Sequence, residues 1–219
     1  MWCSLPQATL LQLSIEGICE FAILYDMTIA EQKRQLRLLS ISLVEKIGAN
    51  LRAQFSEKIQ EQIFQLQAFR NADLVLGFVP TDSEPHINGV YDRAINLEKT
   101  IAFPRCEKAG FMEFHEMGFD WRDRIVRGRL PVYEPDSSVQ APVDYNRYKQ
   151  VLILVPALAY TMHRRRLGRG KGYYDRFLAQ RFSNAQVVGV CFEVQMVAEI
   201  PFEPHDMVVD LVVTESNNY

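Results

Sequence analysis

The run VLILVP, Val151–Pro156, is followed by RRRLGRGKGYYDRFL, Arg164–Leu178, and these two stretches together indicate the fold. The first is continuous, rich in β-branched residues and closed by proline, as is typical of a buried strand in a parallel sheet. After the glycines, apolar residues recur from Tyr173 to Phe182 at roughly the spacing of one helix face. We therefore predict a strand, a glycine-rich turn and a short helix, in that order.

The predicted turn concentrates positive charge. Five cations lie between Arg164 and Lys171, whereas the whole chain of 219 residues has 24 Lys and Arg against 27 Asp and Glu, a formal net charge of -3. The first N–H groups of a helix have no partner within it, and the peptide dipoles leave partial positive charge there. Alternating glycines would allow positive φ and a close backbone approach, and the cations would supply charged donors. The turn therefore predicts a phosphate site built from Gly168, Gly170, Gly172, Arg166, Arg169 and Lys171.

The pattern of this turn is not a standard nucleotide fingerprint. Lys171 is followed by Gly172 rather than Ser or Thr, and the glycines alternate as GxGxG. A solvated basic loop ending in an ordinary helix cap would have a similar composition. The slightly acidic overall charge favours a local anion instead, because the cations are confined to this segment. It also argues against nucleic-acid binding with Tyr173 and Tyr174 as stacking groups, since the sequence has no second basic stripe.

Helical and strand-like patterns alternate along the rest of the chain. Thr28 and Glu31 form a capping box at the start of a helix that continues to Gly48, and a second helix is predicted from Leu51 to Leu66. Strands are predicted over 73–80, 100–104, 112–117, 151–156, 186–192 and 207–214, with a helix over 89–98. This order predicts a three-layer α/β/α fold with a mainly parallel sheet and a ligand site beyond the carboxyl ends of the strands. The region 119–148 is expected to be a long irregular connection.

Length and composition favour one domain over residues 28–219. No apolar run approaches the ~20 residues of a membrane helix, and four cysteines without CxxC spacing favour reduced thiols, so we expect a soluble, cytoplasmic, monomeric protein. Residues 1–27 make a poor secretion signal. Because Met27 immediately precedes the first helix start, we interpret them as an N-terminal extension or an overcalled start.

The glycine turn closely resembles the signature RLGxGxGYYD of the 5-formyltetrahydrofolate cyclo-ligase (5,10-methenyltetrahydrofolate synthetase) family, and RLGRGKGYYD, Arg166–Asp175, is a full match. Three further segments are similar to the family in the same order along the chain: KRQLR at Lys33–Arg37, TDSEPHI at Thr81–Ile87 and PFEPHDMVVDLVV at Pro201–Val213. The resemblance implies a Rossmann-like fold of the NagB/RpiA/CoA transferase-like kind. It also implies ATP- and Mg²⁺-dependent cyclisation of 5-formyltetrahydrofolate, with or without a polyglutamate tail, to the 5,10-methenyl form, through a phosphorylated formyl group and with release of ADP and phosphate.

The resemblance also implies roles for individual residues. Catalysis is carried over to Lys171 and Arg169, and magnesium binding to Asp175 and Asp206. ATP binding falls on Lys33, Arg37, Arg166, Leu167, Gly168, Arg169, Gly170, Lys171, Gly172, Tyr173 and Tyr174. Folate binding falls on Val79, Glu84, Arg169, Gly170, Lys171, Gly172 and Tyr173. Structural roles remain open for several of them, because an acidic residue suits a first helical turn or a loop and an apolar one suits the core.

The chain departs from the family pattern at two places. Thr161 stands where the family has Asp, and Pro85, His86 and Ile87 replace an apolar residue, Asp and Thr. Glu134-Pro135 is similar to the Glu-Pro or Gln-Pro pair that the family has in about this part of the chain. The departures leave a second hypothesis open, a catalytically impaired paralogue that binds folate or nucleotide.

Overall fold

The computed structural model describes residues 27–107, 110–128, 130–139, 142–180 and 183–219. A six-stranded sheet with the order β10-β9-β6-β1-β2-β3 forms its centre. Its strands are β1 (Leu74–Leu76), β2 (Thr100–Cys106), β3 (Met112–Met117), β6 (Val151–Pro156), β9 (Ala185–Val190) and β10 (Leu211–Val213). Neighbouring strands are parallel except β2 and β3, which are antiparallel. The predicted α/β class and the mainly parallel sheet are confirmed.

The strand β6 is central because its residues are apolar on both faces. It pairs with β1, where Val151 lies opposite Leu74, and with β9, where Val151 lies opposite Ala185. Leu152 packs into the core on one face and Ile153 into the core on the other, and both are almost fully buried. Burial on both faces explains why the sequence of this strand is continuously apolar instead of alternating.

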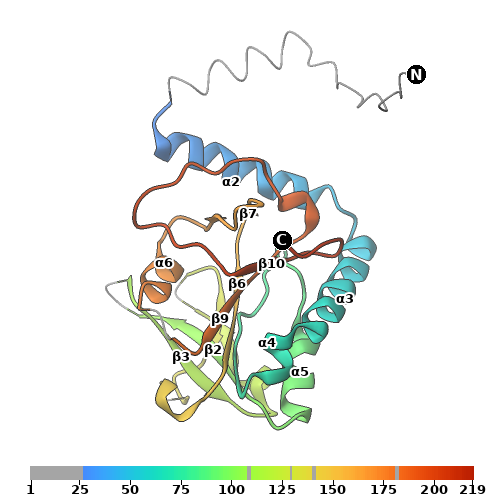
Figure 1. Cartoon of the computed structure of the whole chain (residues 1–219), viewed down its shortest axis with the longest axis vertical. Coiled ribbons are helices and arrows are strands. Elements are labelled where there is room, and N and C mark those ends of the chain that lie inside the picture. The colour runs from blue at the N-terminus through green and yellow to red at the C-terminus, as the bar shows by residue number, and fades with distance from the viewer. Residues whose placement is uncertain (1–26, 108–109, 129, 140–141, 181–182) are drawn as a thin grey trace, which may run out of the picture.

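Helices cover the two faces of the sheet unequally (Figure 1). The helices are α2 (Ile29–Glu45), α3 (Ala49–Gln65), α4 (Gln67–Asn71), α5 (Asn88–Asn96) and α6 (Tyr173–Leu178). Side chains of α3, α4 and α5 form one core with the sheet. On the other face the six-residue α6 supplies Phe177 and Leu178, and irregular segments provide the rest of the apolar cover. The predicted third layer is therefore made mostly of irregular chain.

The helix α2 begins at the predicted capping box. Thr28 Oγ1 accepts the N–H of Glu31, and the Glu31 carboxylate accepts the N–H of Thr28, so two helix-end groups are satisfied. The helix lies across the end of the sheet where β9 finishes and the short 3-10 helix η4 (Glu193–Gln195) follows (Figure 1). Its Leu36 packs beside Leu167 and Ile200. Thus α2 covers the edge where the glycine turn emerges.

The region 119–148 is more regular than expected. It contains a hairpin of β4 (Ile125–Arg127) and β5 (Tyr133–Pro135), with 3-10 helices η2 (Trp121–Arg124) and η3 (Tyr145–Arg147) on either side. The hairpin is anchored by Arg105, whose Nε donates to the carbonyl of Pro135 at 3.1 Å. Sequence periodicity missed it because its strands are three residues long and only Pro135 among them is buried. Trp121 is nevertheless buried against the main core.

Two predictions concern residues that lie mostly outside the described ranges. The expected extension over residues 1–27 lies almost wholly outside the described residues, as does the proposed helix position Phe182. Within the described ranges, no helix combines the length and the hydropathy that crossing a membrane would require.

Candidate functional site

The glycine turn follows a second small hairpin and leads into α6. The strands β7 (Ala159–Tyr160) and β8 (Arg166–Leu167) pair antiparallel directly after β6. Gly170 and Gly172 have φ of 92° and 68°, the left-handed region that favours glycine. Gly168 does not share this conformation, which corrects the expectation for that residue. A Cβ atom there would lie 2.8 Å from Nη1 of Arg166, so a larger residue would have to displace the end of that side chain.

Side chains from distant elements hold the turn in place. Nε of Arg37 on α2 donates to the carbonyl oxygen of Gly168 at 2.9 Å. From the other side, Nη2 of Arg176 on α6 donates to the carbonyl oxygen of Lys171 at 2.8 Å. Because α6 has only six residues, its dipole is small, and the cations and turn amides must supply most of the attraction for an anion. Arg176 was not predicted as a site residue, although it stands one position after the signature.

Arg166 forms a buried ion pair at the start of the turn. Its Nη2 lies 2.6 Å from Oδ1 of Asp175, and its side chain is 3% exposed. The same Oδ1 accepts the backbone N–H of Met207 at 3.2 Å, so Asp175 lies beside the residue that follows Asp206. The two carboxylates predicted to bind magnesium, far apart in sequence, therefore belong to neighbouring segments.

Two polar atoms inside this region have no hydrogen-bond partner among the described residues. They are Nε of Arg166 and Oη of Tyr174, both buried, and the guanidinium carbon of Arg166 lies 5.6 Å from the centre of the Tyr174 ring. Burial, together with the nearby charge of Glu84, raises the pKa of Tyr174, so its hydroxyl stays protonated. Buried polar atoms are normally satisfied, and these two are available to a ligand or an ordered water.

Lys33 on α2 is the centre of a second buried charge cluster. Its Nζ lies 2.6 Å from Oδ2 of Asp206 and 2.8 Å from Oε2 of Glu203, and its side chain is 9% exposed. Burial alone would lower the pKa of Lys33, but the hydrogen bonds to Asp206 and Glu203 outweigh it and the pKa is raised. Burial would likewise raise the pKa of Asp206, but the hydrogen bond from Lys33 and the Glu203 N–H lower it. Both groups therefore stay charged around neutral pH.

Arg169 links the turn to the loop after β1. Its Nη2 lies 2.8 Å from Oγ1 of Thr81, 3.0 Å from Oγ of Ser83 and 3.2 Å from Oε1 of Glu84. The Glu84 side chain is 8% exposed, and its Oε2 accepts the N–H and hydroxyl of Thr81. The predicted phosphate turn and the predicted folate carboxylate are thus brought into contact.

The remaining predicted residues lie around this centre. Lys171 is exposed, and its ammonium group makes no hydrogen bond or ion pair within the described part of the chain. Tyr173 packs against the core beneath Arg176, whose guanidinium carbon is 5.4 Å from the ring centre. Val79 is partly buried against the other core and forms a bridge with Tyr133 of β5. Leu167 is buried beneath α2.

Sequence reasoning missed several partners of the predicted residues. Glu203 and Asp206 both pair with Lys33. The only sequence feature that could have identified Glu203 as a site residue is its position three residues before Asp206. Thr81 and Ser83 hold Arg169 and flank Glu84 in the quoted loop. A polar residue near a predicted site residue is too common a feature for sequence alone to single out.

The departures from the family pattern have local structural explanations. Thr161 is fully buried, and its Oγ1 accepts the N–H of Arg165 at 3.2 Å, which closes the turn between β7 and β8. A short side-chain oxygen at this place caps the turn as an aspartate oxygen would. His86 is exposed, and its backbone N–H donates to the hydroxyl of Ser56 on α3 at 3.0 Å.

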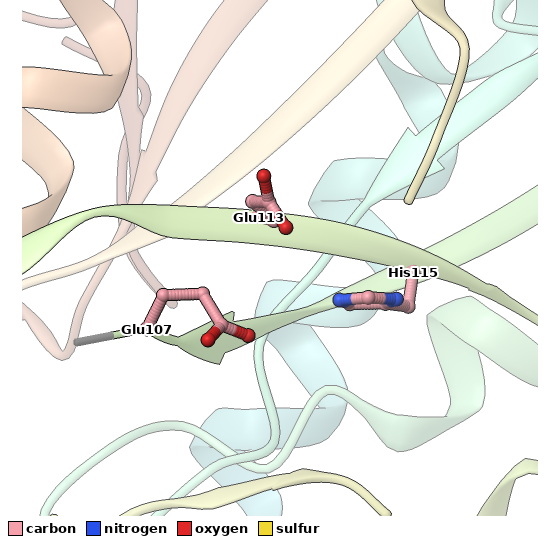
Figure 2. Close-up of side chains that lie close together, drawn as sticks. All are labelled: Glu107, Glu113 and His115. Atoms are coloured by element: carbon pink, nitrogen blue, oxygen red, sulfur yellow. The ribbon is translucent and has the colours of Figure 1, made fainter. Parts of the chain in front are cut away.

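Two groups of side chains among the described residues could hold a metal ion. One consists of Glu203, His205 and Asp206 and belongs to the Lys33 cluster. The other, shown in Figure 2, consists of Glu107, Glu113 and His115 at the antiparallel edge of the sheet.

The edge group already has a cation beside it. Nη1 of Arg105 lies 3.4 Å from Nε2 of His115, and a guanidinium always donates, so it uses the lone pair of that nitrogen. Arg105 is held there by the carbonyl groups of Pro135 and Val139. An imidazole that accepts at Nε2 carries its proton on Nδ1, so His115 has no lone pair left for a metal ion, and we assign none to this edge.

Comparison with known proteins relates most of the described chain to one protein family. The model of the 5-formyltetrahydrofolate cyclo-ligase family matches residues 29–215. The 5-formyltetrahydrofolate cyclo-ligase of Mycolicibacterium smegmatis is 34% identical over 142 residues, which cover 64% of this chain and 72% of that protein. A probable 5-formyltetrahydrofolate cyclo-ligase of Schizosaccharomyces pombe is 26% identical over 195 residues, covering 84% of this chain and 95% of that protein.

Solved structures show the same fold. The 5,10-methenyltetrahydrofolate synthetase of Aquifex aeolicus superposes with a TM-score of 0.69 at 24% identity, covering 88% of this chain and 92% of that one. A 5,10-methenyltetrahydrofolate synthetase from Mycoplasma pneumoniae gives a TM-score of 0.65 at 16% identity, covering 87% and 100%. The family model, which matches most of the length of the chain, shows that the chain belongs to the 5-formyltetrahydrofolate cyclo-ligase family.

Proposed function

We propose that this protein cyclises 5-formyltetrahydrofolate to 5,10-methenyltetrahydrofolate in a reaction that consumes ATP, requires Mg²⁺ and releases ADP and phosphate. The observation that carries the proposal is the contact between Arg169 of the cationic turn and Glu84 of the loop after β1, 3.2 Å apart. A group suited to phosphate and a group suited to the N–H edge of a pterin thereby meet at one point, as transfer between two substrates needs. Membership of the family supplies the substrate class.

The formyl group explains why ATP is needed. Its oxygen is amide-like and leaves poorly when N10 attacks the formyl carbon. We propose that this oxygen attacks the γ-phosphorus, forming an O–P bond while the bond from γ-phosphorus to ADP breaks, which gives an iminium phosphate. N10 then bonds to the same carbon, phosphate leaves with the formyl oxygen, and the N10 proton passes to solvent. Such transfer depends on positioning and charge neutralisation more than on covalent help from the protein.

The cations of the turn would carry out that neutralisation. Lys171, exposed and without a partner among the described residues, can extend to the transferred phosphoryl group. Arg169 would lie between this group and the folate, and the buried Arg166 would donate from its unpartnered Nε. Lys33 and Arg37 approach from α2, where Arg37 already holds Gly168. The turn amides from Leu167 to Tyr174 would complete the wrapping of the phosphates.

The folate would lie on the Glu84 side of the turn. The carboxylate of Glu84 is fixed through Oε2 by Thr81, which leaves Oε1 for the N–H donors of a pterin once Arg169 turns away. Val79 and Tyr173 supply apolar contact on either side. This assignment gives Glu84 the role of orienting the substrate, with the formyl group directed toward the turn.

The acidic residues near the turn fit a magnesium ion. Asp175 uses Oδ1 for Arg166 and Met207, and Asp206 uses Oδ2 for Lys33 and Glu203. The other oxygen of Asp206, Oδ1, lies 3.8 Å from Nε2 of His205, too far for a hydrogen bond, so each carboxylate keeps a second oxygen for a metal ion. Mg²⁺ prefers one or two carboxylates together with phosphate oxygens and water. When bound, the ion would neutralise charge on the transferred phosphoryl group.

The test is a spectrophotometric assay of the purified full-length chain. Incubation with 5-formyltetrahydrofolate, ATP and Mg²⁺ should raise the absorbance of the methenyl product, and omission of ATP or chelation of Mg²⁺ should abolish the increase. Added Mg²⁺ should restore it. No product at high enzyme concentration, with the fold verified by circular dichroism, would refute the proposed activity.

A catalytically impaired paralogue is the second candidate, favoured by Thr161 and His86. It predicts that folate or nucleotide raises the melting temperature without any product. Thr161 keeps a side-chain oxygen that closes its turn, and His86 contacts Ser56 only through its backbone N–H. Neither residue is hydrogen-bonded to Arg169, which supports the active enzyme.

A further inference from the structure

The contact between Arg169 and Glu84 joins two segments that belong to different proposed ligands. Arg169 lies in the turn after β8, and Glu84 lies in the loop after β1, 85 residues earlier. The end of the Arg169 side chain is held by three oxygen atoms of that loop, from Thr81, Ser83 and Glu84. The cation is thus directed at the folate side and not at the turn.

Glu84 cannot lose this partner without cost. Its side chain is 8% exposed, and Oε2 is already used by Thr81, so Oε1 depends on Arg169. A nucleotide that draws Arg169 to its phosphate leaves a buried carboxylate oxygen unpaired, which is unfavourable. A pterin N–H that donates to Oε1 replaces Arg169 as the partner of this oxygen, and Arg169 is then released.

Resting on the proposed function, we infer that the Arg169–Glu84 ion pair couples the nucleotide and folate sites, so that each ligand strengthens the binding of the other. The first ligand to bind, whichever it is, must break the Arg169–Glu84 pair. The second ligand then binds without that cost in free energy. The coupling is therefore positive, and it is reciprocal because it is a property of the binding equilibria. Since the Arg169 side chain is 40% exposed, solvent weakens the pair, and we expect about fivefold to tenfold coupling.

The experiment uses calorimetry on the full-length chain with Mg²⁺ and the non-hydrolysable analogue AMP-PNP. In the wild type, saturating 5-formyltetrahydrofolate should lower the Kd of the analogue by about fivefold to tenfold. Glu84→Gln removes the charge that holds Arg169. It should tighten binding of the analogue in the absence of folate, by about the same factor, and largely abolish the effect of folate.

A matched control separates the pairing from general electrostatics. Asp82 carries the same charge in the same loop but is exposed, and it is not among the hydrogen-bond or ion-pair partners of Arg169, which are Thr81, Ser83 and Glu84. Asp82→Asn should leave the Kd of the analogue without folate within about twofold of the wild type. Ser83→Ala removes one neutral hydrogen bond to Arg169 and should slightly tighten the binding of AMP-PNP in the absence of folate. This variant replaces Glu84→Gln in the experiment if Glu84→Gln does not fold.

The outcomes distinguish this inference from the proposed function. If neither ligand binds the wild type, the proposed function is wrong. If both ligands bind but Glu84→Gln leaves the affinity for AMP-PNP alone unchanged or weaker, direct contact between the ligands explains any synergy and the inference is overturned. An equal effect of Asp82→Asn would overturn it as well.

Discussion

Replacing Lys171 with alanine is expected to lower kcat for the cyclisation by about 10²- to 10³-fold, the usual effect of removing one donor that stabilises transition-state charge. Lys171 is exposed, and its side chain makes no hydrogen bond or ion pair with described residues. The substitution therefore removes a charge without breaking an internal contact. The methenyl absorbance under saturating substrates measures the loss.

The effect should be confined to catalysis. The carbonyl oxygen of Lys171, which accepts from Arg176, remains in the alanine variant, so the melting temperature should be unchanged. Lys149 provides the control. It is an exposed lysine that precedes the amino end of β6, whereas the glycine turn follows the carboxyl end, so Lys149→Ala should retain full activity. A Lys171→Ala enzyme with nearly wild-type kcat would remove this residue from the catalytic machinery.

Replacing Lys33 with methionine is expected to lower the free energy of unfolding by about 3 kcal/mol at neutral pH, as breaking one side of a buried ion pair usually does. Lys33 is buried between Glu203 and Asp206, with distances of 2.8 and 2.6 Å. Methionine keeps the length and apolar character of the side chain but leaves two carboxylates facing each other. Urea unfolding of both proteins gives the difference.

The pH dependence of this difference follows from the two pKa shifts. The pKa of Lys33 is raised, so its contribution is complete below the usual value of 10.5 and is lost as the pH rises through the raised value. The pKa of Asp206 is lowered, so its contribution is present above the usual value of 3.8 and is lost as the pH falls through the lowered value. The difference between the proteins should be constant around neutral pH and shrink in strong acid and strong base.

An exposed pair provides the reference for this stability measurement. Glu199 lies 3.3 Å from Arg165, and its side chain is 71% exposed. Glu199→Gln should change the free energy of unfolding by less than about 1 kcal/mol, because solvent screens such pairs. If Lys33→Met were as mild as Glu199→Gln, the Lys33 cluster would not stabilise the fold.

The main sheet could be predicted because its strands are long or apolar enough to show a period. The strand β6 has bounds identical to the prediction, Val151–Pro156, since burial on both faces leaves a continuous apolar run. The last predicted strand, 207–214, is shorter, with β10 only at Leu211–Val213, because the residues before it turn to meet Asp175. The five-residue helix α4 and the β4–β5 hairpin are too short for a periodic pattern.

The sequence identified most residues of the candidate site, but it could not show which charged side chains pair with one another. The glycines and cations of the turn are contiguous, so their signal is local. The contact between Lys33 and Glu203 spans 170 residues, and that between Arg169 and Glu84 spans 85. The order of the strands and the packing of α2 across the end of the sheet bring these segments together, and one sequence contains no direct record of which charged residues will pair.

Transfer of the formyl oxygen to phosphate is the central claim, and an isotope measurement tests it most directly. 5-Formyltetrahydrofolate labelled with ¹⁸O in the formyl group would be converted with ATP and Mg²⁺, and the released phosphate would be analysed by mass spectrometry. Attack of the formyl oxygen on the γ-phosphorus predicts one ¹⁸O atom in each phosphate released. Methenyl product accompanied by unlabelled phosphate would contradict the account.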